Sequence, residues 1–196
     1  MDEHNNVAWP DKVRRVILVT DGDGIAKKAV ETAALRIGGR CISRSAGNPT
    51  PMSGRRILDL IRQTPYDPVV VMVDDKGNTG TGSGEMVMKE LAESREVEIL
   101  GVIAVASNTE GVKGTSVDFS ITRDGNIINE TVDKYGKKSG GNKINGDTVD
   151  ILDSIDVPVI VGVGDPGKMN GRDCIDKGAP ILTKAMKEIM ERSSKH

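Results

Sequence analysis

The sequence has few aromatic residues and no excess of positive charge, and both shortages exclude classes of function. Aromatic side chains make up only 2% of the 196 residues, namely Trp9, Tyr66, Phe119 and Tyr135. This argues against a platform that stacks single-stranded nucleic acid or RNA. The net charge is −2, which provides no overall basic surface. We therefore predict no direct nucleic-acid partner.

Cysteines, histidines and long apolar runs are also scarce. Cys41 and Cys174 are too few for a disulfide framework, which favours a reduced intracellular chain. His4 and His196 lie at the two ends, so neither is expected to be a buried catalytic base, and no Gly-x-Ser-x-Gly motif marks a nucleophile. No apolar run approaches the ~20 residues that span a bilayer. Any contact with a membrane is therefore expected to be peripheral or to go through a partner.

The apolar periodicity predicts an α/β protein. Residues 1–12 are polar and expected to be loose, whereas residues 13–196 are expected to form one domain. Up to residue 106, predicted strands and helices alternate, which implies a parallel sheet with helices on both faces, a three-layer α/β sandwich. The predicted strands are 16–19, 40–44, 69–73, 98–106 and 157–163, and the predicted helices are 25–37, 57–61, one from 85 onward, 147–155 and 179–192.

The pattern changes after the fourth predicted strand. Val117, Phe119 and Ile121 alternate with polar residues, and Asp124-Gly125 follows as a turn signal, so we predict a β-hairpin insertion there that partly faces solvent. Residues 131–146 are rich in lysine and glycine and carry few apolar side chains, which predicts a mobile loop.

The signals of function gather where predicted strands end, because ligands collect at the carboxyl ends of parallel strands. Carboxylates there can hold a hard cation, and glycines can bring backbone N–H groups close to an anion. The candidate metal ligands, for Mg²⁺ or Ca²⁺, are Asp21, Asp23, Asp74, Asp75 and Asp165. The candidate ligand-binding residues are Asp74, Asp75, Lys76, Gly77, Gly82, Asn108 and Lys168.

The same residue types also have structural roles. Asp and Gly after strands are ordinary turn and N-cap residues, and lysines in loops are commonly solvated. The glycine-rich stretch 77–84 matches neither the phosphate-binding Walker motif nor the dinucleotide fingerprint, so a flexible loop and an anion cradle both remain open.

Residues 14–93 resemble the TOPRIM fold of topoisomerases and primases. An acid follows the first strand, a glycine-bounded helix and a short strand come next, and paired aspartates follow a hydrophobic strand. The resemblance implies Mg²⁺-dependent phosphoryl transfer. The sequence departs from the TOPRIM pattern because Asp21 or Asp23 stands where the family has Glu. In addition, Asp74 and Asp75 are adjacent, so a strand would direct them to opposite sides.

A second resemblance covers residues 13–192. The strings that carry it are RRVILVTDGD at 14–23, SAGNPTP at 45–51, DPVVVMVDDKG at 67–77, VASNT at 105–109 and VPVIVGVGDPGKM at 157–169. They are similar to the soluble form of the stage V sporulation protein AE family of spore-forming bacteria. The resemblance implies a spore component associated with the proteins that move dipicolinic acid and its calcium across the inner spore membrane. It supplies no catalytic residues.

These observations lead to a hypothesis and alternatives. The hypothesis is a non-enzymatic accessory protein of sporulation and germination, located peripherally at the inner spore membrane and acting through other proteins of the dipicolinate-transport system. The first alternative is a metal-dependent TOPRIM-like phosphoryl-transfer or nucleotide-binding enzyme. The second is a sensor in which Lys76, Asn108 and Lys168 hold an anionic ligand such as dipicolinate. Self-association is left open.

Overall fold

Strands and helices alternate along the first half of the chain, as the apolar periodicity predicts. The computed structural model describes residues 12–77, 82–108, 113–146 and 148–195. The strands are β1 (Arg14–Val19), β2 (Arg40–Cys41), β3 (Val69–Met72), β4 (Val97–Val105), β5 (Thr115–Ser116), β6 (Phe119–Ile121), β7 (Ile127–Ile128), β8 (Lys143–Ile144) and β9 (Ile160–Val163). The α-helices are α1 (Gly24–Arg36), α2 (Gly54–Gln63), α3 (Ser83–Glu93) and α4 (Pro180–Ser193), and the 3₁₀-helices are η1 (Ser43–Ser45), η2 (Asp150–Ser154) and η3 (Ile175–Lys177).

The central sheet has the strand order β2-β3-β1-β4-β9-β6-β7. All its pairs are parallel except β6 with β7, which form an antiparallel hairpin. β5 and β8 form a separate antiparallel pair. The interior strands are apolar on both faces, and every residue of β3 is buried, as expected of parallel strands covered by helices on both sides.

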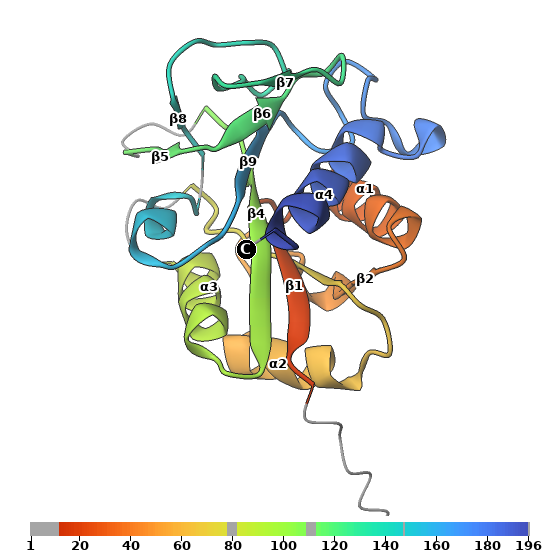
Figure 1. Cartoon of the computed structure of the whole chain (residues 1–196), viewed down its shortest axis with the longest axis vertical. Helices are drawn as coiled ribbons and strands as arrows, with labels where there is room; N and C mark the ends of the chain where they lie inside the picture. The colour runs from red at the N-terminus through yellow and green to blue at the C-terminus, as the bar shows by residue number, and fades with distance from the viewer. Residues whose placement is uncertain (1–11, 78–81, 109–112, 147, 196) are drawn as a thin grey trace, which may run out of the picture.

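Two apolar cores lie on the two faces of this sheet. Ile17 and Val19 of β1 point to the core formed with α1 and α4, whereas Val16 and Leu18 point to the core formed with α2 and α3. The period-2 alternation of strand side chains therefore divides one continuous apolar run between two layers. In Figure 1, α1 and α4 lie together at the right, and α3 and α2 lie at the left and bottom. The three-layer α/β sandwich is confirmed.

The helices begin and end at residues suited to the task. Asp23 is the N-cap of α1, and Gly38, with φ +80°, follows its last turn. Ser53 is the N-cap of α2, where its hydroxyl accepts a hydrogen bond from Arg56 N at 3.3 Å. Pro180 occupies the first turn of α4, where its missing N–H costs nothing.

Three predicted elements are shorter than the apolar patterns indicated. The strand predicted at 40–44 ends at Cys41, because the chain turns into η1 and the Ser45 hydroxyl accepts the hydrogen bond of Met72 N instead. The last strand begins at Ile160 rather than at 157, since Pro158 has no N–H for the ladder. The helix predicted at 147–155 is the 3₁₀-helix η2, and Asp147 lies outside the described residues.

The hairpin and the lysine-rich stretch are more closely integrated than predicted. β6 pairs with β9, and Phe119, Ser120 and Ile121 are all buried, so the hairpin extends the main sheet. Residues 131–146, predicted to be a mobile loop, instead form a long connection that is held by backbone hydrogen bonds. Within it Thr131 pairs with both Ser139 and Gly141 through backbone bonds, and β8 pairs with β5.

A long apolar helix is not found in the part of the chain that the structure describes. No helix there combines the length and the hydrophobicity needed to cross a bilayer.

Candidate functional site

β1 and β3 are neighbours in the sheet, yet the chain leaves them towards opposite faces. β1 leads to α1, whose buried side chains belong to one core, and β3 leads to α3, whose buried side chains belong to the other. Open α/β sheets bind ligands at such a switch point, outside the carboxyl ends of the two strands. The turns after β1 and β3 are therefore the candidate site, and we call this region the crevice.

The turn after β1 is held by its own carboxylates. Asp21 Oδ1 accepts a hydrogen bond from Asp23 N at 3.0 Å, and Asp23 Oδ1 accepts from Ile25 N and Ala26 N, both at 2.8 Å. Asp23 thereby satisfies two of the free N–H groups that begin α1. Gly22 lies between the two acids, and a Cβ there would overlap the Gly47 carbonyl. Only glycine lets this turn approach the loop after β2 so closely.

The two acids after β3 diverge, as the alternation of strand side chains predicts. Asp74 Oδ1 accepts from Lys76 N at 2.6 Å, and the Asp74 backbone pairs with Thr50 on the loop after β2. Asp75 instead accepts from Gly84 N at 2.6 Å and Glu85 N at 3.3 Å. Asp75 is thus a capping group for α3, supplied from the end of a strand.

The glycines before α3 have a packing role. A Cβ at Gly82 would collide with the Asp75 carboxylate, and a Cβ at Gly84 would lie 2.8 Å from Asp74 N. These two glycines allow the start of α3 to lie directly against the end of β3. The anion cradle predicted for 77–84 stays a prediction, because residues 78–81 lie outside the described residues.

A lysine from a third strand end joins the acids. Lys168, on the loop after β9, donates from Nζ to Asp23 Oδ2 at 2.7 Å and lies 3.9 Å from Asp165 Oδ2. Burial would lower the pKa of Lys168, but its hydrogen bond to Asp23 and the surrounding acids outweigh this and raise it. Burial would likewise raise the pKa of Asp23, but the hydrogen bond with Lys168 outweighs burial and lowers it.

Asp21 is the most perturbed acid of the crevice. Burial raises its pKa from 3.8 to about 7, and the charges of Asp23 and Asp74 add to the increase against the opposing effects of Asp23 N–H and Lys168. Burial is also the main cause of the raised pKa of Asp165. Near neutral pH the crevice therefore holds a carboxyl group that can gain or lose a proton.

The structure brings some of the predicted residues together and separates others. Asp21, Asp23, Asp74, Asp165 and Lys168 interact electrostatically with one another across the crevice. Asp75 belongs to the cap of α3. Lys76 and Gly77 are exposed with positive φ, and Asn108 is exposed beyond β4.

A divalent cation at these acids stays a prediction. Among residues 12–77, 82–108, 113–146 and 148–195, no group of three or more His, Cys, Asp or Glu side chains is arranged to hold a metal ion. The Lys168 ammonium already supplies positive charge to Asp23 and Asp165. The donors at the strand ends therefore fit an ion-pair network better than a metal centre.

The loop after β2 contributes Ser45, which stands at a predicted strand end, and Thr50, which went unrecognised in the sequence. The Thr50 hydroxyl accepts from Asp74 N at 2.8 Å, and the Ser45 hydroxyl donates to Ile42 O at 2.7 Å. Both residues are buried. The Thr50 hydroxyl connects its loop to the end of β3, and the Ser45 hydroxyl bonds within its own turn. The available signal for Thr50 was its position in the polar string 45–51, which follows a predicted strand end as the aspartates do.

The architecture and the site define a class: a three-layer α/β protein with a mainly parallel sheet and a network of acids and one lysine across its switch point. The model of the family described as Stage V sporulation protein AE1 matches residues 15–193, and the chain belongs to this family. The protein therefore has a role related to sporulation. No curated protein and no solved structure matches the chain. The TOPRIM resemblance of residues 14–93 stays a prediction.

Proposed function

We propose that the protein is a non-enzymatic accessory component of the dipicolinate-transport system, bound peripherally at the inner spore membrane through protein partners. The observation that carries the proposal is the family match, which extends over residues 15–193. The role in sporulation that follows from the match is consistent with a component that helps to load the spore with calcium dipicolinate or to release it.

The geometry of the crevice supports a binding role rather than a reaction centre. The carboxylates of Asp23 and Asp75 accept hydrogen bonds from backbone N–H groups in the first turns of α1 and α3. Lys168 connects the loop after β9 to the turn after β1. These contacts fix the loops at the carboxyl edge of the sheet, and fixed loops lower the entropic cost of binding a partner.

The test uses a spore-forming bacterium that encodes this chain. We expect deletion of the gene to lower the dipicolinate content of the spores or to slow its release during germination, with recovery when the wild-type gene is restored. We also expect a tagged chain to co-purify with transport proteins from solubilised inner spore membrane. Normal uptake and release in the deletion strain, together with the absence of any co-purifying transport protein, would rule the proposal out.

A second candidate is a site for Mg²⁺ or Ca²⁺ and its phosphoryl-transfer chemistry, because the carboxylates of Asp23 and Asp74 lie near Asp21. Asp21, with a pKa of about 7, is partly protonated at neutral pH. A cation that bound Asp21 would have to displace this proton. Calorimetric titration with each ion in two buffers of different ionisation enthalpy should then show proton release, and Asp21→Asn should abolish it. Unchanged binding in Asp21→Asn, or none in the wild type, would remove Asp21 from any metal site.

A further inference from the structure

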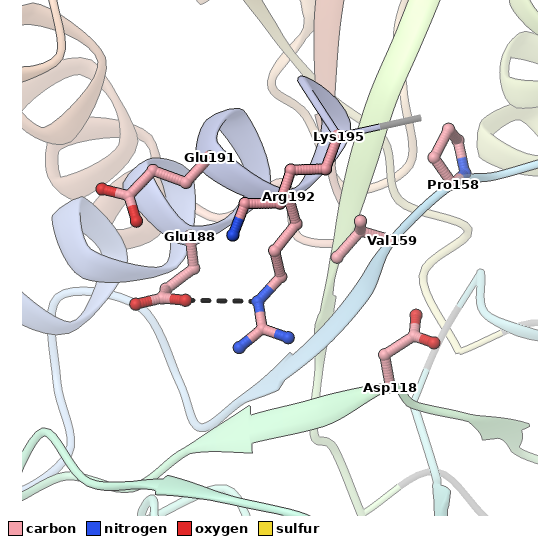
Figure 2. Close-up of a pocket in the computed structure, with 7 residues that line it drawn as sticks. All are labelled: Asp118, Pro158, Val159, Glu188, Glu191, Arg192 and Lys195. Atoms are coloured by element: carbon pink, nitrogen blue, oxygen red, sulfur yellow. Dashed lines mark hydrogen bonds and ion pairs between the residues drawn. The ribbon is translucent and has the colours of Figure 1, made fainter.

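A cavity of about 490 Å³ lies away from the crevice, where the second half of α4 faces the residues that precede β6 and β9. Figure 2 shows Arg192 reaching down from α4 on one side, Asp118 on the other, and Val159 between them. The volume is in the range of pockets that take small molecules. The crevice, by contrast, lies at the carboxyl ends of the strands, so the cavity is a separate feature of the fold.

The Arg192 side of the cavity is held in place before any ligand arrives. The Arg192 guanidinium lies 4.0 Å from the centre of the Phe119 ring, a stacked cation–π contact. Its Nε donates to Glu188 Oε2 at 3.2 Å, one helical turn earlier. The two Nη groups have no hydrogen-bond partner within the part of the chain that the structure describes. They form a fork suited to a carboxylate.

The Asp118 side is also positioned. Asp118 Oδ2 accepts a hydrogen bond from Ile160 N at 2.7 Å, which fastens the carboxylate to the first residue of β9. The second oxygen, Oδ1, accepts no hydrogen bond from the described residues. Asp118 and Arg192 form no ion pair with each other, although both line the same cavity. Two positioned, opposite charges thus face a shared space with the apolar Val159 between them, and Glu188, Glu191 and Lys195 complete the charged part of the lining.

We infer that this cavity binds a small zwitterion, a free amino acid or a similar molecule that carries one carboxylate and one ammonium group. The carboxylate binds the Arg192 Nη groups, the ammonium binds Asp118 Oδ1, and the carbon body lies against Val159. A dicarboxylate would place one carboxylate beside Asp118, Glu188 or Glu191, and a diamine would place one ammonium beside Arg192 or Lys195. Each therefore brings a like charge against the lining, whereas a zwitterion can match both signs. The inference is independent of the role in dipicolinate transport.

The experiment is a titration of the full chain, followed by ¹⁵N–¹H NMR, with matched linear probes. The probes are 4-aminobutyrate and 6-aminohexanoate as zwitterions, glutarate as a dicarboxylate, and 1,5-diaminopentane as a diamine. We expect saturable shifts with a zwitterion at residues around Asp118, Val159 and Arg192, and binding at least tenfold weaker for the other two probes.

Two variants test the two ends of the ligand. Arg192→Lys keeps the charge but removes the fork, and Asp118→Asn keeps an acceptor for Ile160 N but removes the charge. Each should weaken zwitterion binding at least tenfold, whereas the exposed control substitutions Arg55→Lys and Asp176→Asn should leave it unchanged. Thermal melts confirm that each variant folds. Absence of zwitterion binding, equal binding of glutarate or diaminopentane, or unaltered affinity in Arg192→Lys would overturn the inference.

Discussion

Replacing Asp21 with asparagine should stabilise the protein by an amount that is near zero at pH 4, grows as the pH rises to about 7 and stays constant above that. Asp21 is ionised in the unfolded chain above about pH 4, but burial keeps it protonated in the folded chain up to about pH 7. Between these two values the folded state binds more protons than the unfolded state. The free energy of unfolding therefore falls as pH rises through this window and levels off above it. Asparagine cannot ionise, and its amide oxygen can still accept from Asp23 N.

The size of the effect follows from the shift in pKa. The change from 3.8 to about 7 spans roughly three pKa units, and each unit corresponds to about 1.4 kcal/mol, so the ionised Asp21 costs at most about 4 kcal/mol. Water entry and movement of the Lys168 side chain reduce this cost on ionisation. We expect Asp21→Asn to raise the free energy of unfolding by about 1–2 kcal/mol at pH 8.

Urea denaturation at half-unit steps from pH 4 to pH 8.5 measures this difference directly. The gain in Asp21→Asn over the wild type should be near zero at pH 4 and should grow through pH 5–7. Asp176→Asn removes an exposed carboxylate and controls for the loss of one negative charge. Parallel stability curves for Asp21→Asn and the wild type across this range would refute the assignment of a buried, neutral carboxyl group to Asp21.

Two further predictions each compare a pair of positions with different surroundings. Gly84→Ala should cost about 1–3 kcal/mol because its Cβ would press on the Asp74 backbone, whereas Gly24→Ala, with nothing within 4 Å, should be nearly neutral in the same urea titrations. Ser120→Ala should raise the melting temperature because the fully buried Ser120 hydroxyl has no partner among the described residues. Ser45→Ala should lower the melting temperature because the Ser45 hydroxyl makes two hydrogen bonds. Equal melting temperatures for the two serine variants would contradict this account.

The sheet was predictable where the signal is local. The apolar run Val69–Val73 and the helical spacing that begins at Ile25 identify β3 and α1 because their periodicities need no knowledge of distant residues. The strand pairing of β6 was not predictable in this way. Its partner β9 is far along the chain, and the buried Ser120 is polar, so alternation alone suggested a hairpin partly exposed to solvent.

The same distinction between local and long-range signals applies to the candidate site. Sequence reasoning placed Asp21, Asp74 and Lys168 at strand ends, and the structure brings these ends to one crevice. It could not predict that Lys168 pairs with Asp23, because the two residues are far apart in sequence and meet only once β9 is in place. The same holds for the cavity beside Arg192, whose walls come from α4 and from the residues before β6 and β9.

The position of β9 also matters while the protein is being made. Val102–Val105 of β4 pair with β9, but a ribosome synthesises β9 only after the whole hairpin and the lysine-rich connection. Until then a nascent chain carries β4 as an open edge of apolar residues, the kind of edge that recruits strands from other chains. A chain that ended before Ile160 would lack β9, so this edge of β4 would stay exposed. A chain that ended within α4 would keep all the strands of the sheet but lack part of one covering layer.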